Sequence, residues 1–326
     1  MTGAEPRVTV LTPVYNGEPY LAECIESVIG QRYKNWDYII VNNCSTDNTL
    51  AIATRYAEGD RRIRIVNNET FVDGIANHNI AFSLLPAESK YCKVISADDW
   101  IYPECLDRLV NVAEMNPSVG IVSCYALTNR GRRASDVPPV DEVFPGRSVC
   151  RMHVLGARIL GAPTTVLYRA DVVRSRQPFF TVKAPSADIR ASLEILQLSD
   201  FGFVHQVLCF ERLHEGSVSS TLMAVNSFLV DRLDFVVSYG SALLTPPERD
   251  RRIEDLLSAY YEFLADSIIH LAGPEFRKYH RDRLADLGYP IDNLRLARAV
   301  SRRVIDWLVN PRRTFTKMTK RLLQKA

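Results

Sequence analysis

Residues 91–99 read YCKVISADD, an apolar run that ends in two adjacent carboxylates. The run predicts a strand, and Asp98 and Asp99 follow directly after it. Residues 8–16, VTVLTPVYN, and residues 38–46, YIIVNNCST, have the same form, a short apolar run followed by polar residues. Because ligands bind beyond the carboxyl ends of the strands in an open parallel sheet, we expect the three polar endings to share one rim and to form a site.

The rest of the first 125 residues alternates between strand and helix patterns. Further strands are predicted at Ile63–Val66 and Gly120–Tyr125, and intervening segments such as 21–29 carry apolar residues at helical spacing. This alternation predicts an α/β fold, in which helices flank both faces of a mainly parallel sheet.

The later part of the chain is less regular. Asn129–Val149 is rich in Arg, Pro, Gly and Asp, which predicts a mobile loop. Thr164–Tyr168 and Phe203–Glu211 are predicted strands, and Ala187–Leu198 is a predicted helix. Residues 221–326 have a helical pattern throughout, which predicts a C-terminal helical extension.

The composition is that of a globular protein, with 47% hydrophobic and 24% charged residues among 326. The net charge of +2 is too small to favour nucleic acid as a partner. Seven dispersed cysteines without a CxxC pair indicate reduced thiols rather than disulfide bonds or a zinc site. The sequence shows no secretion signal and no apolar run long enough to span a bilayer, so we expect a cytoplasmic protein.

The segment 301–326 has a separate character. It carries eight Lys or Arg against one acid, Asp306, and apolar residues such as Leu308, Phe315 and Leu322 are interspersed among them. A basic amphipathic segment of this kind suits peripheral contact with an anionic membrane surface, and it suits a solvated terminal helix equally well.

The adjacent pair Asp98 and Asp99 is the sharpest feature for chemistry. Two neighbouring carboxylates repel each other unless a cation lies between them, and Mg²⁺ or Mn²⁺ binds carboxylate oxygens together with substrate phosphates. The alternative is that Asp99 caps the following helix while Asp98 is solvated. The convergence of three polar strand ends favours the metal. No GxGxxG or GxxxxGK[ST] segment occurs, so the chain lacks the main signals of dinucleotide dehydrogenases and P-loop enzymes.

An ordered set of segments resembles the family 2 glycosyltransferases, which have the GT-A fold. VTVLTPVYNGEPYL at 8–21 resembles the family's opening, and VNNCSTDNT at 41–49 is similar to its VDDGSTDNT. ISADDWIYP at 95–103 resembles its DxDD…P segment, and RLHEGSVS at 212–219 its R-x-H-x-G-S-x-S segment. The resemblance covers about residues 7–220 and implies a GT-A domain over 1–220.

The resemblance implies roles for the matching positions at the nucleotide. Thr12, Pro13 and Tyr15 would line the pocket for the base, with Tyr15 packed on the base. Asn43 stands where an Asp usually recognises the base, and His78 stands where an Arg usually helps to bind the nucleotide. Uracil is the base that the resemblance favours, although an amide at Asn43 adds a donor and removes a charge.

The resemblance also implies a catalytic set. Asp98 matches the second Asp of the DxD metal motif and would also meet the nucleotide sugar, and Asp99 follows it. His214 matches a position near the metal or the diphosphate, although a structural role is as good an interpretation. Asp188 matches the base that takes a proton from the acceptor hydroxyl, and its position also suits a helix cap. Ser96 replaces the first Asp of DxD, which predicts weaker metal binding.

We therefore expect an inverting, Mg²⁺- or Mn²⁺-dependent glycosyltransferase. It would move a sugar from a nucleoside diphosphate, most plausibly UDP, to a hydroxyl of a glycan or lipid-linked glycan of the cell surface. A non-catalytic, nucleotide-binding scaffold with the same fold is the alternative that Asn42, Asn43, Ser96 and His78 support. A nucleotidyltransferase is less favoured, because the segment after the first strand is not a Gly-rich, Arg-containing loop.

Overall fold

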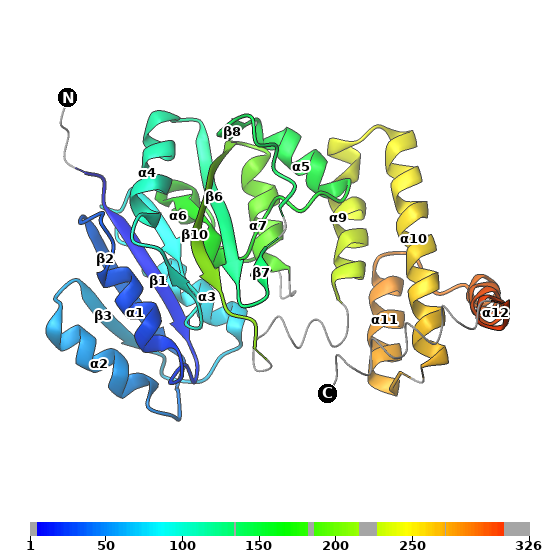
Figure 1. Ribbon diagram of the computed structural model, residues 1–326, viewed down its shortest axis with the longest axis horizontal. Coiled ribbons are helices and arrows are strands. Elements are labelled where there is room, and N and C mark those ends of the chain that lie inside the picture. Colours follow the sequence, from blue (N-terminus) through cyan, green and yellow to red (C-terminus); the bar gives the residue numbers. More distant parts are fainter. Residues whose placement is uncertain (1–4, 134, 182–185, 215–226, 271, 310–326) are drawn as a thin grey trace. The chain divides into compact units, whose positions relative to one another are not determined.

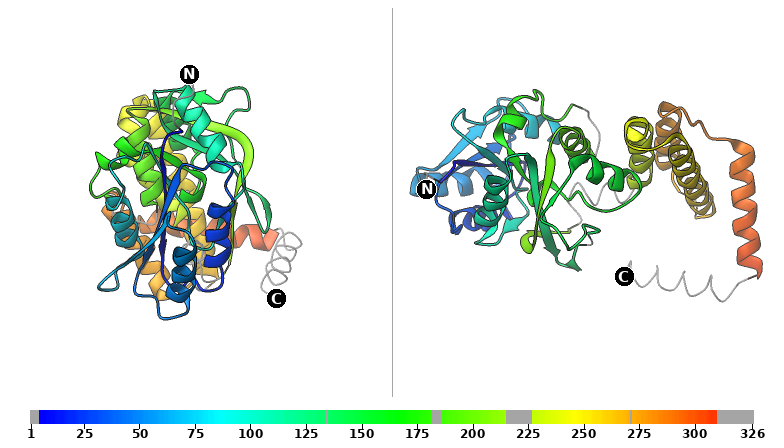
Figure 2. Two further views of the ribbon diagram at one scale, coloured as in Figure 1. Left: turned by 90° about the vertical axis from the view of Figure 1, so that its left-hand side faces the viewer. Right: turned by 90° about the horizontal axis from the view of Figure 1, so that it is seen from above.

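The computed structural model describes residues 5–133, 135–181, 186–214, 227–270 and 272–309. The chain divides into two compact units, Met1–Ser220 and Thr221–Ala326. In its described part, the first unit is one ten-stranded sheet with helices on both faces (Figures 1 and 2). The strands are β1 (Val8–Val14), β2 (Trp36–Asn42), β3 (Ile63–Asn67), β4 (Tyr91–Val94), β5 (Trp100–Ile101), β6 (Val119–Thr128), β7 (Gly131–Arg132), β8 (Val143–Phe144), β9 (Leu167–Arg169) and β10 (Asp200–Glu211).

The order across the sheet is β3-β2-β1-β4-β9-β6-β10-β5. The pairs β2–β3, β1–β2, β1–β4 and β6–β10 are parallel, whereas β9 runs antiparallel to both of its neighbours. The mainly parallel sheet that the alternating pattern predicts is confirmed. The helices of this unit are α1 (Leu21–Ile29), α2 (Thr49–Gly59), α3 (Gly74–Ser83), α4 (Cys105–Met115), α5 (Gly146–Val154), α6 (Ala170–Arg174) and α7 (Ala187–Leu196).

The period-2 pattern of β1 explains why helices cover both faces. Val8 and Val10 belong to the core that the sheet shares with α1 and α4. Leu11, one residue on, is also fully buried but points to the other face, where α3 contacts β1 and β2. A strand with apolar side chains on both faces is stable only when helices bury both faces. For this reason β1 and β2 lie between two helix layers.

Two predictions from the sequence are wrong in part. The predicted loop Asn129–Val149 holds the short strands β7 and β8 and the start of α5, because β7 pairs with β6 and β8 pairs with β10. Its Pro and Gly residues mark turns between short elements. The predicted strand Thr164–Tyr168 begins as a 3₁₀ turn at Pro163–Thr165, since proline suits the first position of a helix, and extends as β9 only from Leu167.

The second unit, in its described residues, is helical, as the pattern of 221–326 predicts. A capping box of Thr245 and Glu248 starts its longest described helix. The buried His280 bonds the hydroxyl group of Tyr260. No helix in the described ranges is both long and apolar enough to cross a membrane. The helices are α9 (Phe228–Leu243), α10 (Pro246–Ile269), α11 (Pro274–Asp286) and α12 (Asn293–Val309).

Candidate functional site

The carboxyl ends of β2, β1 and β4 form one rim, as expected from their polar endings. These three strands are parallel neighbours, with β1 in the middle. The backbone continues the pairing past the strand ends, because Asn43 N donates to Val14 O at 2.9 Å and Ile95 N donates to Leu11 O at 3.0 Å. The sheet therefore delivers the three polar segments to one edge.

Hydrogen bonds tie the loops after β1 and β2 together. Those of Asn16 and Gly17 join neutral groups, whereas Glu18 N donates to the carboxylate of Asp47 at 3.1 Å. Asn16 adopts a left-handed conformation, with φ of 50°, and its Oδ1 accepts from Thr46 N at 2.8 Å. The backbone N–H of Asn16 donates to Ser45 Oγ at 3.0 Å, and that of Gly17 donates to Thr49 Oγ1 at 2.8 Å. This half of the rim is held in shape before any ligand binds.

The side-chain amide of Asn43 makes three hydrogen bonds within this half. Its Oδ1 accepts from Asn68 Nδ2 at 2.9 Å and from Val72 N at 3.0 Å, and its Nδ2 donates to Val72 O at 2.8 Å. Thr12 is fully buried, and its hydroxyl donates to Ile95 O at 2.9 Å, so its side chain lies beneath the rim and not on it. Asn43 thus shapes the segment 68–72, which borders the expected base pocket.

Tyr15 is 48% exposed, as expected for a side chain that would pack on a base. Its ring meets Phe71 edge to face, with centroids 4.8 Å apart, and Phe71 is 60% exposed. Pro13 is half-buried, two residues before Tyr15. No motif surrounds Phe71, a single aromatic residue between β3 and α3, so it could not be singled out from the sequence. The two rings offer an apolar surface beside the neutral rim.

His78 lies on α3, one turn from its start. Its Nδ1 donates to the carbonyl of Gly74 at 2.7 Å, which leaves Nε2 as the free nitrogen. Burial lowers the pKa of His78, so the imidazole is neutral at neutral pH. A neutral imidazole supplies no fixed charge, in contrast to the Arg that the family usually has at this position.

The other half of the rim carries charge. Asp98 Oδ2 lies 3.0 Å from His214 Nε2, and both side chains are little more than a quarter exposed. The two residues are far apart in sequence, and they meet because β5, which directly follows Asp99, pairs antiparallel with the end of β10. The sequence-predicted ligands Asp98 and His214 are therefore brought together at the surface of the rim.

Asp99 has a different environment from Asp98. It is 6% exposed, its Oδ2 accepts from Thr164 Oγ1 at 2.5 Å, and its Oδ1 accepts from Arg212 N at 2.9 Å. Burial raises the pKa of Asp99 to about 7, and the charge of Asp98 adds to this shift. Because protein donors occupy both oxygens, Asp99 acts here as the link that joins β4, the turn before β9 and the end of β10.

The guanidinium of Arg212 contacts several residues around Asp98. Its Nε donates to Asp98 O at 3.1 Å, and it pairs with Glu23 on α1. The guanidinium also lies over the ring of Tyr20, 4.6 Å from the centroid, and this ring packs beside His214 at 5.1 Å. The positions of Asp98 and His214 are thus fixed by several contacts around them.

Asp188 lies in the first turn of α7 and is half-buried. Burial raises the pKa of Asp188 to about 6, while the backbone amides of Ile189 and Asp188 and the charge of Arg133 oppose the shift. The two amides belong to the first turn of α7, so the carboxylate can stabilise the start of this helix, although its N-cap residue is Ser186. A carboxyl with a pKa near neutrality is also suited to accept a proton, so the geometry is compatible with both roles.

Two residues that the sequence did not single out complete this half. Arg133, directly after β7, pairs with the buried Glu211 at the end of β10. Burial lowers the pKa of Arg133, whereas the charges of Asp188 and Asp99 raise it, which places the guanidinium within electrostatic reach of both carboxylates. Neither residue belongs to a motif, and only the hairpin of β6 and β7 brings them together.

The side chains that could bind a metal suit an ion shared with the substrate better than an ion surrounded by protein ligands alone. The described residues contain no group of three or more His, Cys, Asp or Glu side chains that could hold a metal ion. Asp98 and His214 supply one carboxylate and one imidazole at the surface. Mg²⁺ or Mn²⁺ bound by one or two protein ligands completes its shell with water and substrate phosphates, so the pair fits a metal that arrives with a diphosphate.

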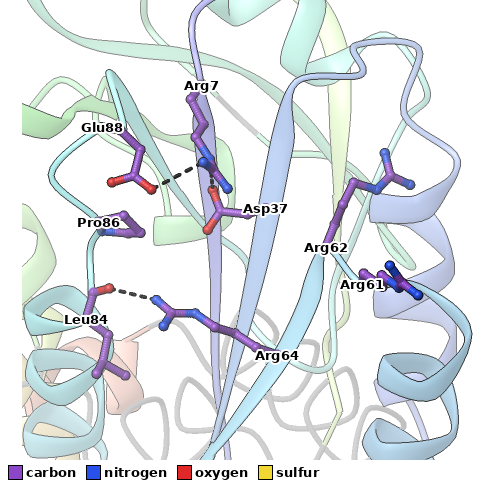
Figure 3. Close-up of a pocket in the computed structure, with 8 residues that line it drawn as sticks. All are labelled: Arg7, Asp37, Arg61, Arg62, Arg64, Leu84, Pro86 and Glu88. Atoms are coloured by element: carbon purple, nitrogen blue, oxygen red, sulfur yellow. Dashed lines mark hydrogen bonds and ion pairs between the residues drawn. The ribbon is translucent and has the colours of Figure 1, made fainter.

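A cavity of about 540 Å³ lies elsewhere, at the amino ends of the strands (Figure 3). Its charged groups largely satisfy one another. Arg7 bonds Asp37 and Glu88, and Arg64 donates to Leu84 O at 3.1 Å. This cavity is at the edge of the sheet opposite to the polar rim. Ligands of open parallel sheets bind beyond the carboxyl ends of the strands, so the rim and not this cavity is the candidate site.

Comparison with known proteins agrees with this geometry. A family model described as Glycosyl transferase family 2 matches residues 9–156. EpsE of Bacillus subtilis (strain 168), which is described as a glycosyltransferase, is 36% identical over 290 residues, 86% of this chain and 95% of EpsE. The chain belongs to glycosyltransferase family 2. Membership in this family sets the nucleotidyltransferase interpretation aside.

Further similar proteins support the assignment and the fold. TuaG of B. subtilis (strain 168), described as a teichuronic acid biosynthesis glycosyltransferase, is 28% identical over 68% of this chain and 84% of TuaG. The structure of S. aureus TarS 1–349 with UDP-GlcNAc has a TM-score of 0.65 at 18% identity over 90% of this chain and 87% of TarS. The mannosyltransferase PcManGT from Pyrobaculum calidifontis, with GDP-Man and Mn²⁺, has a TM-score of 0.53 at 19% identity over 98% of this chain and 85% of that one. The glycosyltransferase thus has the GT-A fold that the sequence segments implied.

Proposed function

We propose that this glycosyltransferase transfers a sugar from a nucleoside diphosphate to an acceptor hydroxyl with inversion at the anomeric carbon. The observation that carries the proposal is the arrangement of the charged half of the rim. Asp98 and His214 lie 3.0 Å apart at its surface, and Asp188, with a pKa of about 6, belongs to the same electrostatic cluster through Arg133. One base and one metal site are sufficient for a direct displacement.

In this mechanism Asp98 and His214 would hold Mg²⁺ or Mn²⁺ together with the diphosphate. A metal held there would supply positive charge to stabilise the leaving diphosphate. Asp188 accepts the proton of the acceptor hydroxyl as its oxygen attacks. Asp99 and Arg212 keep Asp98 in place, because Arg212 bonds both Asp98 O and Asp99 Oδ1.

For the donor we propose a UDP-sugar. The support is the aromatic pair Tyr15–Phe71, which offers a stacking surface for a base, and the UDP-GlcNAc that TarS binds. PcManGT binds GDP-Man on the same fold, so GDP is the competing base. Asn43 would act on the base pocket by shaping the segment 68–72, because its own amide is engaged there.

For the acceptor we propose a glycan or lipid-linked glycan of the cell surface. The support is the similarity to TuaG, which is described as a teichuronic acid biosynthesis enzyme. We also propose peripheral membrane contact through residues 301–326. Of this segment the structure describes 301–309, and residues 310–326 lie outside the described residues. On α12, Ile305 is 58% and Leu308 76% exposed, close to the exposed Arg302.

The stereochemistry is tested directly with the purified enzyme. UDP-glucose, UDP-GlcNAc and GDP-mannose, all α-linked donors, are incubated with Mn²⁺ and a synthetic lipid-linked acceptor, and the anomeric configuration of the product is read by NMR. A β-linked product is expected from direct displacement. An α-linked product would contradict inversion, and binding of a donor without any transfer or hydrolysis would favour the non-catalytic scaffold.

A further inference from the structure

Glu211 is a buried carboxylate of which only one oxygen has a partner among the described residues. The residue is 4% exposed, and its Oε2 pairs with Arg133. Its Oε1 is also buried and has no hydrogen-bond partner among the described residues. An ionised carboxylate can accept about four hydrogen bonds, and a buried oxygen without a donor is unfavourable. Such an oxygen requires a donor, which either an ordered water molecule or a ligand can supply.

The backbone fixes the position of Arg133 opposite Glu211. The hairpin turns at Gly131, with φ of 110°, and Arg133 N donates to Ala126 O at 2.9 Å. Asn129 fastens the same hairpin to the segment after β10, because its Nδ2 donates to Leu213 O at 2.9 Å and its Oδ1 accepts from Leu213 N at 3.2 Å. Arg133 and Glu211 are therefore presented together by neighbouring strand ends.

The pair is linked to both functional ends of the rim. Glu211 directly precedes Arg212, whose backbone bonds Asp99 beside the proposed diphosphate position. Arg133 lies within electrostatic reach of Asp188, the proposed base. In a direct displacement, the transferred sugar occupies the space between the diphosphate and the base. The pair is thus within electrostatic reach of the carboxylates on both sides of this space.

We propose that Glu211 and Arg133 form the subsite for the transferred sugar. This inference rests on the proposed function of the rim. Glu211 Oε1 accepts a hydrogen bond from a hydroxyl or amide N–H group of the sugar ring, and Arg133 donates to an oxygen of the same ring. The ligand class is a neutral hexose or N-acetylhexosamine joined to a nucleoside diphosphate, because the ion pair already balances its own charge.

The competing role is purely structural, a clip that holds the hairpin on β10. The two roles predict different ligand dependence. A sugar contact affects the nucleotide sugar and spares the free nucleoside diphosphate, whereas a clip affects both ligands equally or only the stability of the fold. The exposed pair Asp136–Arg158, joined at 3.0 Å in the same segment, provides a matched control for the loss of an ion pair.

The experiment is calorimetric titration, with Mn²⁺, of wild type, Glu211→Ala, Glu211→Gln and Asp136→Asn. The ligands are UDP, UDP-glucose, UDP-galactose, UDP-GlcNAc, GDP and GDP-mannose, and the quantity compared is the ratio of Kd for the tightest nucleotide sugar to Kd for its free nucleotide. We expect Glu211→Ala to raise this ratio about tenfold and to change the Kd of the free nucleotide less than about twofold. Glu211→Gln, which keeps an acceptor oxygen, should raise it less, and Asp136→Asn should leave it unchanged.

An unchanged ratio in folded Glu211→Ala would overturn the subsite, and so would equal weakening of both ligands. If Glu211→Ala does not fold, as judged by circular dichroism, Glu211→Gln decides between the same outcomes. Failure of the proposed function is detected separately, because wild type would then give no transfer or an α-linked product in the NMR assay, whatever the ratio of the Kd values is.

Discussion

The two halves of the rim are built from different chemistry. At the ends of β1 and β2, neutral groups such as Asn16 and Asn43 satisfy one another through short hydrogen bonds. At the ends of β4 and β10, carboxylates gather around few cations, and burial raises the pKa of Asp99 to about 7 and that of Asp188 to about 6. The amides of the neutral half have partners within the protein, whereas we expect the charged half to be stabilised by a ligand that brings positive charge.

This contrast explains how a family 2 enzyme can carry Asn42 and Asn43 where two Asp residues are usual. The amides hold the segment beside the proposed base pocket, because Asn42 Nδ2 donates to Asn67 Oδ1 at 2.9 Å and Asn43 bonds Asn68 and Val72. The proposed chemistry depends on the charged half, which keeps Asp98, Asp188 and His214. Substitutions in the two halves should therefore have different consequences.

The largest expected effect is on the transfer rate of Asp188→Asn. Loss of the base should lower kcat by about 10²- to 10⁴-fold, because an amide cannot accept the proton of the acceptor hydroxyl. The Kd of the nucleotide should stay within about twofold of wild type, measured by titration beside the rate. Unchanged turnover would remove Asp188 from the role of base and leave it as a cap of α7.

The second effect is on the metal dependence of Asp98→Ala. Loss of one of two protein ligands should weaken binding of the nucleoside diphosphate in Mn²⁺ by about 10- to 100-fold, and little Mn²⁺ dependence should remain. Calorimetric titration with and without Mn²⁺ measures both quantities. Asp107→Ala, an exposed acid on α4, is the control and should bind as wild type does. Full Mn²⁺ dependence in Asp98→Ala would contradict the proposed ligand set.

The third effect is a pH dependence. Asp188 acts as a base only when ionised, and its pKa is about 6, so kcat/KM should be constant above pH 7 and should fall about tenfold per pH unit below pH 6. The acid limb should be absent from the residual activity of Asp188→Asn. A pH–rate profile with nucleotide saturation checked at each pH makes the measurement. An acid limb that persists in the variant would assign the titration to another group.

Much of this contrast could be read from the sequence, and some of it could not. The three polar strand ends predict a common rim because parallel strands impose it, and the family segments mark Asp98, Asp188 and His214. The roles of Asp99 and Asn43 could not be predicted, since hydrogen bonds from Thr164, Arg212 and Val72 to these residues arise only when distant segments meet. Phe71, Arg133 and Glu211 belong to no motif, and only the folded loops reveal them.

The smallest effect on catalysis is expected in the neutral half. Asn43→Ala leaves Val72 and Asn68 without their partners and should lower the free energy of unfolding by about 1–3 kcal/mol. Its kcat at nucleotide saturation should remain within about threefold of wild type. Urea unfolding and steady-state rates test the two statements together. A loss of kcat as large as that of Asp188→Asn, in a stable variant, would abolish the distinction between the halves.

The most direct test of the central claim is a thermal-shift measurement with UDP, GDP, dTDP and CMP, each with and without Mn²⁺. Ligands that bind the native state raise its apparent stability by mass action. The account predicts an upward shift with one nucleoside diphosphate that depends on Mn²⁺ and is lost in Asp98→Ala. No shift with any nucleotide, or a shift that is the same without Mn²⁺ and in Asp98→Ala, would contradict a metal-assisted site at the charged half of the rim.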